Sequence, residues 1–117
     1  MLENNDEIEK RHKQAILAIS NELETKADAS AVSDFITHHL EEIDGDFWQK
    51  HLGSARPNSI QVLDLLVLRS HWSVVGNDID DNGIDNFDFT LPENATDYVI
   101  CVRFDKAGQV DTISMES

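Results

Sequence analysis

Residues 98–115 constrain the fold more than any other part of the chain. The first seven are rich in β-branched and aromatic types, and they run into residues 105–108, where Gly108 can adopt the positive φ of a short turn. Side chains alternate along a strand, so one face would carry Tyr98, Ile100, Val102 and Phe104. The pattern predicts a β-hairpin whose apolar face forms the floor of the core.

Two more strands are expected before this hairpin. From Arg69 onward, Ser70, Trp72 and Val74 alternate with residues of the opposite face, and residues 87–91 alternate in the same way until Pro92 stops them. Residues 77–83, rich in Asp and Asn, are predicted to be a loop. The four strands would form an antiparallel meander over residues 69–116.

Residues 5–67 are predicted to be helical. Asn5 or Asp6 would cap a first helix ending near residues 25–27, and Asp28 or Ser30 would cap a second. The apolar face expected on the first helix consists of Ile8, Ala15, Ile16, Ile19 and Leu23. The face expected on the second consists of Val32, Phe35, Ile36, His39, Leu40 and Ile43.

Two shorter helices should follow. Residues 47–53 are expected to form one that Gly53 closes, after a break at residues 44–46. The apolar run over residues 60–68 suits either a strand or a helix. Its polar residues Gln61 and Asp64 would share a side only in a helix, so we predict a helix capped by Asn58 or Ser59.

The predicted architecture is therefore α+β, with N-terminal helices packed on one face of a four-stranded antiparallel β-meander. A chain of 117 residues with 40% hydrophobic content suits a single domain over residues 1–117.

The charge of the chain is strongly acidic. Twenty-three Asp and Glu residues against nine Lys and Arg give a formal net charge of −14. Such a charge repels nucleic-acid phosphates and anionic lipid headgroups and attracts cationic surfaces, so neither nucleic acid nor membrane is expected as a partner. The N-terminal residues lack a basic start and an apolar segment, and one cysteine forms no internal disulfide. We expect a cytoplasmic protein.

The acidic residues concentrate in one interval. Between Arg69 and Arg103 there is no Lys or Arg. The carboxylates of this interval are Asp78, Asp80, Asp81, Asp85, Asp88, Glu93 and Asp97. They form either a set of solvated loops or a docking surface for a basic partner, because such charge accelerates encounter and discriminates between partners.

Two patterns suggest metal ligands but are incomplete. Residues 78–83 match the opening of a calcium loop, yet the position of the closing glutamate is occupied by Phe89. His38 lies one helical turn from Asp34 and Glu42, but His39 points to the apolar face, so the two histidines do not converge. No metal or cofactor is expected.

Catalytic patterns are also incomplete. Cys101 lies in the middle of a predicted strand, where a cysteine commonly fills space, and Ser70 and His71 are strand neighbours whose side chains point apart. Asn94 begins a glycosylation acceptor sequence, which has no significance without a secretory signal. We expect no catalytic residues and no enzymatic activity.

The closing third of the chain resembles a known family. The similar segments are residues 87–92, 96–100 and 102–105, Gly108, and the ending at residues 113–117. Together they resemble the small bacterial proteins called domain of unknown function 2004, over roughly the last 50 residues. The resemblance implies a bacterial cytosolic protein and carries over no catalytic residues. By analogy, small acidic proteins of this kind often serve as immunity partners of basic toxin domains.

The leading hypothesis is a non-enzymatic protein that binds a basic partner, most concretely an immunity protein that covers the cationic cleft of a toxin nuclease. Two alternatives remain open. One is a small-ligand-binding protein or enzyme with a pocket between helices and sheet, near His39, His71 or Trp72. The other is an accessory subunit with a different partner.

Overall fold

The computed structural model describes residues 2–25, 30–81 and 83–117. Within them the chain forms four α-helices and then five strands, which confirms the α+β class. The helices are α1 (Leu2–Thr25), α2 (Ala31–Glu42), α3 (Gly45–Leu52) and α4 (Ser59–Leu65). The strands are β1 (Val67–Val75), β2 (Asp78–Asp80), β3 (Asn86–Thr90), β4 (Val99–Phe104) and β5 (Val110–Glu116). A 3-10 turn, η1 (Pro92–Asn94), joins β3 to β4.

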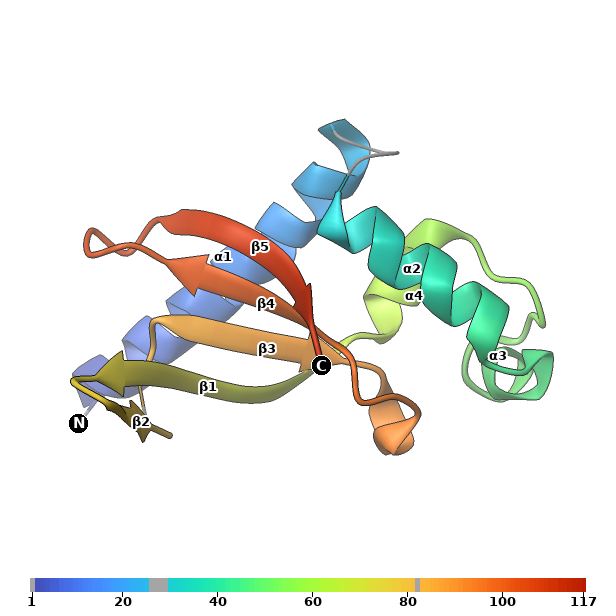
Figure 1. Ribbon diagram of the computed structural model, residues 1–117. Coiled ribbons are helices and arrows are strands. Elements are labelled where there is room, and N and C mark those ends of the chain that lie inside the picture. Colours follow the sequence, from blue (N-terminus) through green and yellow to red (C-terminus); the bar gives the residue numbers. More distant parts are fainter. Residues whose placement is uncertain (1, 26–29, 82) are drawn as a thin grey trace.

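The strands form one antiparallel sheet in the order β2-β1-β3-β4-β5 (Figure 1). The expected meander is present as β1, β3, β4 and β5, but the number of strands was wrong by one. Residues 77–83 are not only a loop, because Asp78–Asp80 pairs with residues 73–75 of β1. Gly76, at φ 63°, and Asn77 form the two-residue connection between β1 and β2. A Gly-Asn pair is a hairpin signal, and it was available in the sequence.

One face of the sheet carries the core. Phe87 and Phe89 of β3 pair with Val102 and Ile100 of β4, and all four side chains are buried. Helix α1 crosses this face behind the sheet in Figure 1. Helices α2 and α4 lie to the right of the sheet, and α2 contacts β4 and β5. The buried core consists of Ala15, Ile19, Val32, Phe35, Ile36, Trp48, Val62, Phe87, Phe89, Leu91, Ile100, Val102 and Phe104. The helical pattern therefore placed most core residues correctly, although Ile16 is 46% exposed rather than buried.

The ends of the short helices follow their capping residues. Ser30 caps α2 by accepting a hydrogen bond from Ser33 N at 3.0 Å, while Asp28, the other candidate, lies outside the described residues. Asn58 and Gln61 form a reciprocal capping box at the start of α4. Gly53 ends α3 at φ 72°.

Four predicted boundaries were wrong. Asn5 and Asp6 lie inside α1, which already extends back to Leu2. Helix α3 begins at Gly45, within the predicted break. Helix α4 ends at Leu65, and β1 begins at Val67, so the apolar run over residues 60–68 contains the end of a helix and the start of a strand. Apolar residues are common in both helices and strands, so hydrophobicity alone does not indicate where the helix ends and the strand begins.

Candidate partner-binding surface

One end of the sheet collects exposed carboxylates. The β1–β2 hairpin and the segment that follows it present Asp78, Asp80, Asp81 and Asp85, all exposed. The turn between β4 and β5 lies at the same end of the sheet (Figure 1) and adds Asp105 and, just after it, Asp111. Four of the seven predicted partner-binding residues therefore converge, and the structure adds two more that lie outside the interval selected from the sequence.

Backbone hydrogen bonds hold the segment before β3 against the sheet. Gly83 N donates to Asp80 O at 3.0 Å, and Asp85 N donates to the Ser73 hydroxyl at 3.1 Å. Phe104 N donates to Asp85 O at 2.7 Å. The main chain that carries Asp85 is thus fixed to both β1 and β4, so this carboxylate is presented from a defined backbone position.

Arg11 ties α1 to the same end of the sheet. Its side chain is 11% exposed, and it donates to Glu7 Oε2 at 2.7 Å and to Ile84 O at 2.8 Å. The guanidinium carbon lies 5.2 Å from the ring centroid of Phe104, and Nη1 lies 3.9 Å from Asp85 Oδ1. The hydrogen bond from Arg11 holds the pKa of Glu7 below its usual value. The sequence did not indicate this role of Arg11, because Ile84, Asp85 and Phe104 lie far along the chain.

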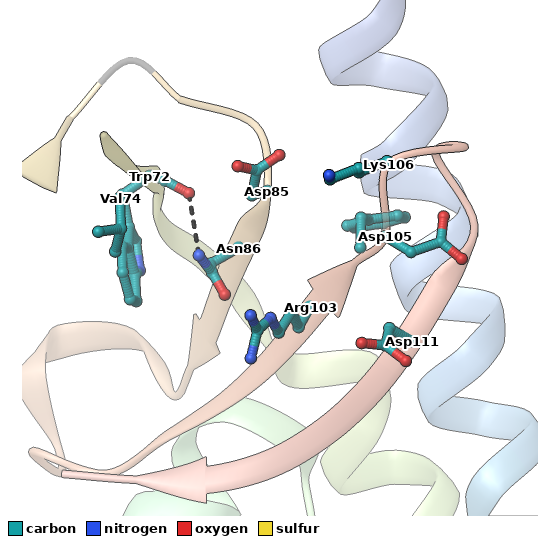
Figure 2. Close-up of a pocket in the computed structure, with 9 residues that line it drawn as sticks. Trp72, Val74, Asp85, Asn86, Arg103, Asp105, Lys106 and Asp111 are labelled. Atoms are coloured by element: carbon teal, nitrogen blue, oxygen red, sulfur yellow. Dashed lines mark hydrogen bonds between the residues drawn. The ribbon is translucent and has the colours of Figure 1, made fainter. Parts of the chain in front are cut away.

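A hollow of about 450 Å³ opens beside these carboxylates. Figure 2 shows Trp72 and Val74 on one side of it and the β4–β5 turn on the other, with Arg103 extending from β4 toward Asn86. Asp85, Asp105 and Asp111 line the hollow together with the cations Arg103 and Lys106. The hollow therefore presents both signs of charge. The charged side chains of residues 74–81 are all carboxylates, and they lie among the exposed apolar side chains of Val74, Val75 and Ile79.

The other three predicted residues lie elsewhere. Asp88 is on β3, on the sheet face opposite the core, where its Oδ2 accepts a hydrogen bond from Trp72 Nε1 at 3.0 Å. Asp97 is exposed beside the same face.

Glu93, in η1, pairs with Lys50 Nζ at 2.9 Å and with His51 Nε2 at 2.5 Å. These hydrogen bonds, led by the one from Lys50, lower the pKa of Glu93. Glu93 is thus engaged within the chain.

A hollow of about 800 Å³ lies on the face opposite the core, and Cys101, the one cysteine of the chain, is among its lining residues. Cys101 is 7% exposed and is paired across β3–β4 with Asp88. Burial, reinforced by a hydrogen bond and the charge of Asp88, raises the pKa of the Cys101 thiol to about 12. A thiol with such a pKa is protonated at neutral pH and is a poor nucleophile.

The three residues of the alternative ligand pocket do not line one pocket, although His71 and Trp72 both border the hollow of about 800 Å³. His39 is 1% exposed, and its ring nitrogens bond to Phe35 O at 2.6 Å and to the Thr96 hydroxyl at 2.8 Å. His71 bonds to Gly83 O at 2.7 Å and stacks on Phe87. Trp72 lies on the face that points away from the helices. Both histidines have contacts that suit a structural role.

Within residues 2–25, 30–81 and 83–117, no cluster of three or more His, Cys, Asp or Glu side chains is arranged to hold a metal ion. His38 instead packs edge-on against Tyr98, with ring centroids 5.0 Å apart. Asn82 of the calcium-like segment lies outside the described residues. None of the helices in the described part of the chain is long and apolar enough to span a membrane.

Comparison with known proteins gave no match to a protein-family model, a curated protein or a solved structure.

Proposed function

We propose that this protein is a non-enzymatic binding protein for a basic partner protein. The partner docks on the acidic end of the sheet, which we define by Asp78, Asp80, Asp81 and Asp85. The observation that supports this proposal most is the convergence of Asp78, Asp80, Asp81 and Asp85 as exposed side chains on one end of the sheet. The hydrogen bonds from Asp85 N and Gly83 N fix the backbone there. Pre-positioned charge reduces the ordering needed on binding and attracts a cationic surface from a distance.

In its most concrete form, we propose an immunity protein that occludes the cationic cleft of a toxin nuclease. A nuclease cleft must attract phosphates, so its positive potential is complementary to a chain of formal charge −14. The resemblance to domain of unknown function 2004 is consistent with a bacterial protein of this kind and stays a prediction. A toxin gene immediately upstream of the gene for this chain would support the proposal.

Charge-neutralising variants test the proposal directly. A basic partner would first be isolated by affinity capture with the wild-type chain, and its association kinetics would be measured over a range of salt concentrations. Replacing Asp78, Asp80, Asp81 and Asp85 with Asn should slow association and flatten its salt dependence. The matched control replaces four exposed acids of α2 and α3, Asp34, Glu41, Glu42 and Asp46, with their amides. It removes the same charge from a different surface.

The two variants distinguish the effect of charge on the proposed surface from the effect of the net charge of the whole chain. The proposal expects a much larger loss of association rate in the first variant than in the control. Equal losses would show that net charge alone attracts the partner, and an unchanged rate in the first variant would place the binding surface elsewhere. Both of these outcomes contradict the proposed surface.

A further inference from the structure

The edge of the sheet opposite β2 has an open backbone. Strand β5 is the last strand in the sheet order. Six of its seven residues pair with β4, and Asp111 is left out of the register at a bulge. Alternate residues of an antiparallel edge strand direct their N–H and C=O groups away from the sheet. Among the described residues, no backbone or side-chain hydrogen bond reaches these groups of β5. The strand therefore retains unpaired donors and acceptors.

A groove runs along this edge. It lies between the C-terminal half of α1 and the first half of β5 and has a volume of about 450 Å³. Its walls consist of Ala18, Asn21, Glu22 and Thr25 from α1 and Val110, Asp111, Thr112 and Ile113 from β5. In Figure 1 α1 passes behind the sheet near β5, so the helix supplies a side wall next to the open strand. The small side chain of Ala18 leaves room in that wall.

Exposed edge strands normally carry features that prevent further pairing, such as lysine or proline. Strand β5 has neither. It carries the charged residues Asp111 and Glu116, and Asp111 lies at a bulge opposite Arg103 and Phe104 of β4. The groove adds Glu22, so its described walls contain two carboxylates and no Lys or Arg. A basic segment is thus favoured over a neutral or acidic one. A second copy of the chain is disfavoured, because each copy has a formal charge of −14 and an acidic β5.

We propose that the groove between α1 and β5 binds an extended basic peptide segment as an added strand on β5. Main-chain hydrogen bonds to the edge of β5 supply affinity, and pairing of lysine or arginine side chains with Glu22 and Asp111 supplies specificity. This surface lies at the edge of the sheet opposite β2. It is therefore a second surface. Asp111 also lines the hollow beside the acidic end, but Asp78, Asp80, Asp81 and Asp85 do not line the groove.

Synthetic peptides test this site with the full chain. The probe is a short blocked peptide in which lysine alternates with valine. One control has the same sequence with alternate backbone amides methylated, and another has glutamate in place of lysine. We expect saturable binding of the lysine peptide, with slowed hydrogen exchange at β5 amides. The N-methylated peptide should bind much more weakly, because it lacks the backbone donors of one edge.

Two double variants test whether the carboxylates of the groove contribute to peptide binding. The double variant E22Q/D111N should weaken binding of the lysine peptide by up to about fivefold per carboxylate, the upper limit for exposed ion pairs. The control E41Q/D46N changes two exposed acids outside the groove and should leave affinity nearly unchanged. The quadruple Asn variant of the acidic end should also bind the peptide normally, which separates this proposal from the proposed function.

Three results would overturn the inference. Equal binding of the N-methylated peptide would exclude strand addition. Exchange protection confined to residues 78–81 would show that the peptide binds the acidic end instead. A stable dimer of the free chain with protected β5 amides would show that a second copy covers the edge.

Discussion

Arg11 donates a hydrogen bond from its guanidinium to the backbone carbonyl of Ile84 at 2.8 Å, across 73 residues of sequence. The same side chain packs on Phe104 and pairs with Glu7. One residue of the N-terminal helix thus holds the segment before β3, from which Asp85 projects. The acidic end of the sheet depends on this contact between the helical and β halves of the chain.

Replacing Arg11 with Met should lower the free energy of unfolding by roughly 1.5–3 kcal/mol, the usual range for hydrogen bonds that involve a charged group. Lys13→Met is the control, because Lys13 is exposed on the same helix and should change stability by less than about 0.5 kcal/mol. Urea denaturation of both variants measures the difference. Equal stability of the two variants would show that the Arg11 contacts contribute little.

Replacing Gly83 with Ala should destabilise the fold. A Cβ at this position would clash with Ser73 N and with the Ser73 side chain, so the backbone must shift. Overpacking of this kind costs about 1–3 kcal/mol. Gly45→Ala, whose Cβ would lie 3.1 Å from that of Ala55, should cost less. Thermal denaturation compares the two, and a larger loss in Gly45→Ala would contradict the packing at Gly83.

Acidification should weaken the fold through His39. Burial, partly opposed by the hydrogen bond to Phe35, lowers the pKa of His39 from its usual 6.5, so the unfolded chain binds a proton more readily than the folded one. Stability from this residue is therefore complete above pH 6.5 and is lost as the pH falls through the folded-state pKa. The variant His39→Gln should show a flatter dependence of melting temperature on pH between about 7.5 and 5.5. An identical slope in variant and wild type would contradict this role.

Removing residues 113–117 should abolish cooperative unfolding. The deletion removes four of the six paired positions between β4 and β5, together with the packing of Ile113 and Met115 against the core. The edge of β4 would then be exposed. Circular dichroism during heating measures the transition. A melting temperature within a few degrees of the full chain would show that β5 is dispensable for the fold.

Cys101 should resist thiol reagents in the folded protein. It is 7% exposed and has a pKa raised to about 12, so almost no thiolate is accessible at pH 8. Labelling should become fast only when denaturant unfolds the chain. Rapid labelling under native conditions would contradict the buried position of this side chain.

Short sequence patterns correctly predicted the turns and helix ends that depend on one residue and its near neighbours. Gly108 adopts φ 82° in the β4–β5 turn, and Ser30 caps α2, both as expected from residue type. Strand β2 was missed because its acidic composition is typical of loops. Its pairing with β1 depends on the turn at Gly76 and Asn77, and Ile79 is its only apolar residue.

The candidate surface was predictable only in part. The concentration of Asp residues between Arg69 and Arg103 was visible in the sequence, and four of them do converge. The engagement of Glu93 with Lys50 and His51 was not visible, because more than 40 residues separate the partners. Asp105 and Asp111 lie at the same end of the sheet as the four converging Asp residues only because the β4–β5 turn and the β1–β2 hairpin are at that end, with β3 between β1 and β4. Such proximity arises from the strand order, which no short pattern specifies.

Helix α1 also has a hydrodynamic consequence. Its 24 residues span about 36 Å at 1.5 Å per residue, and the molecule measures 42 × 29 × 28 Å along its principal axes. A body of this shape rotates more slowly about its short axes than about its long one. Nitrogen-15 relaxation rates should therefore depend on the orientation of each N–H bond, so that amides of α1 and of the strands report different apparent correlation times in the same rigid molecule.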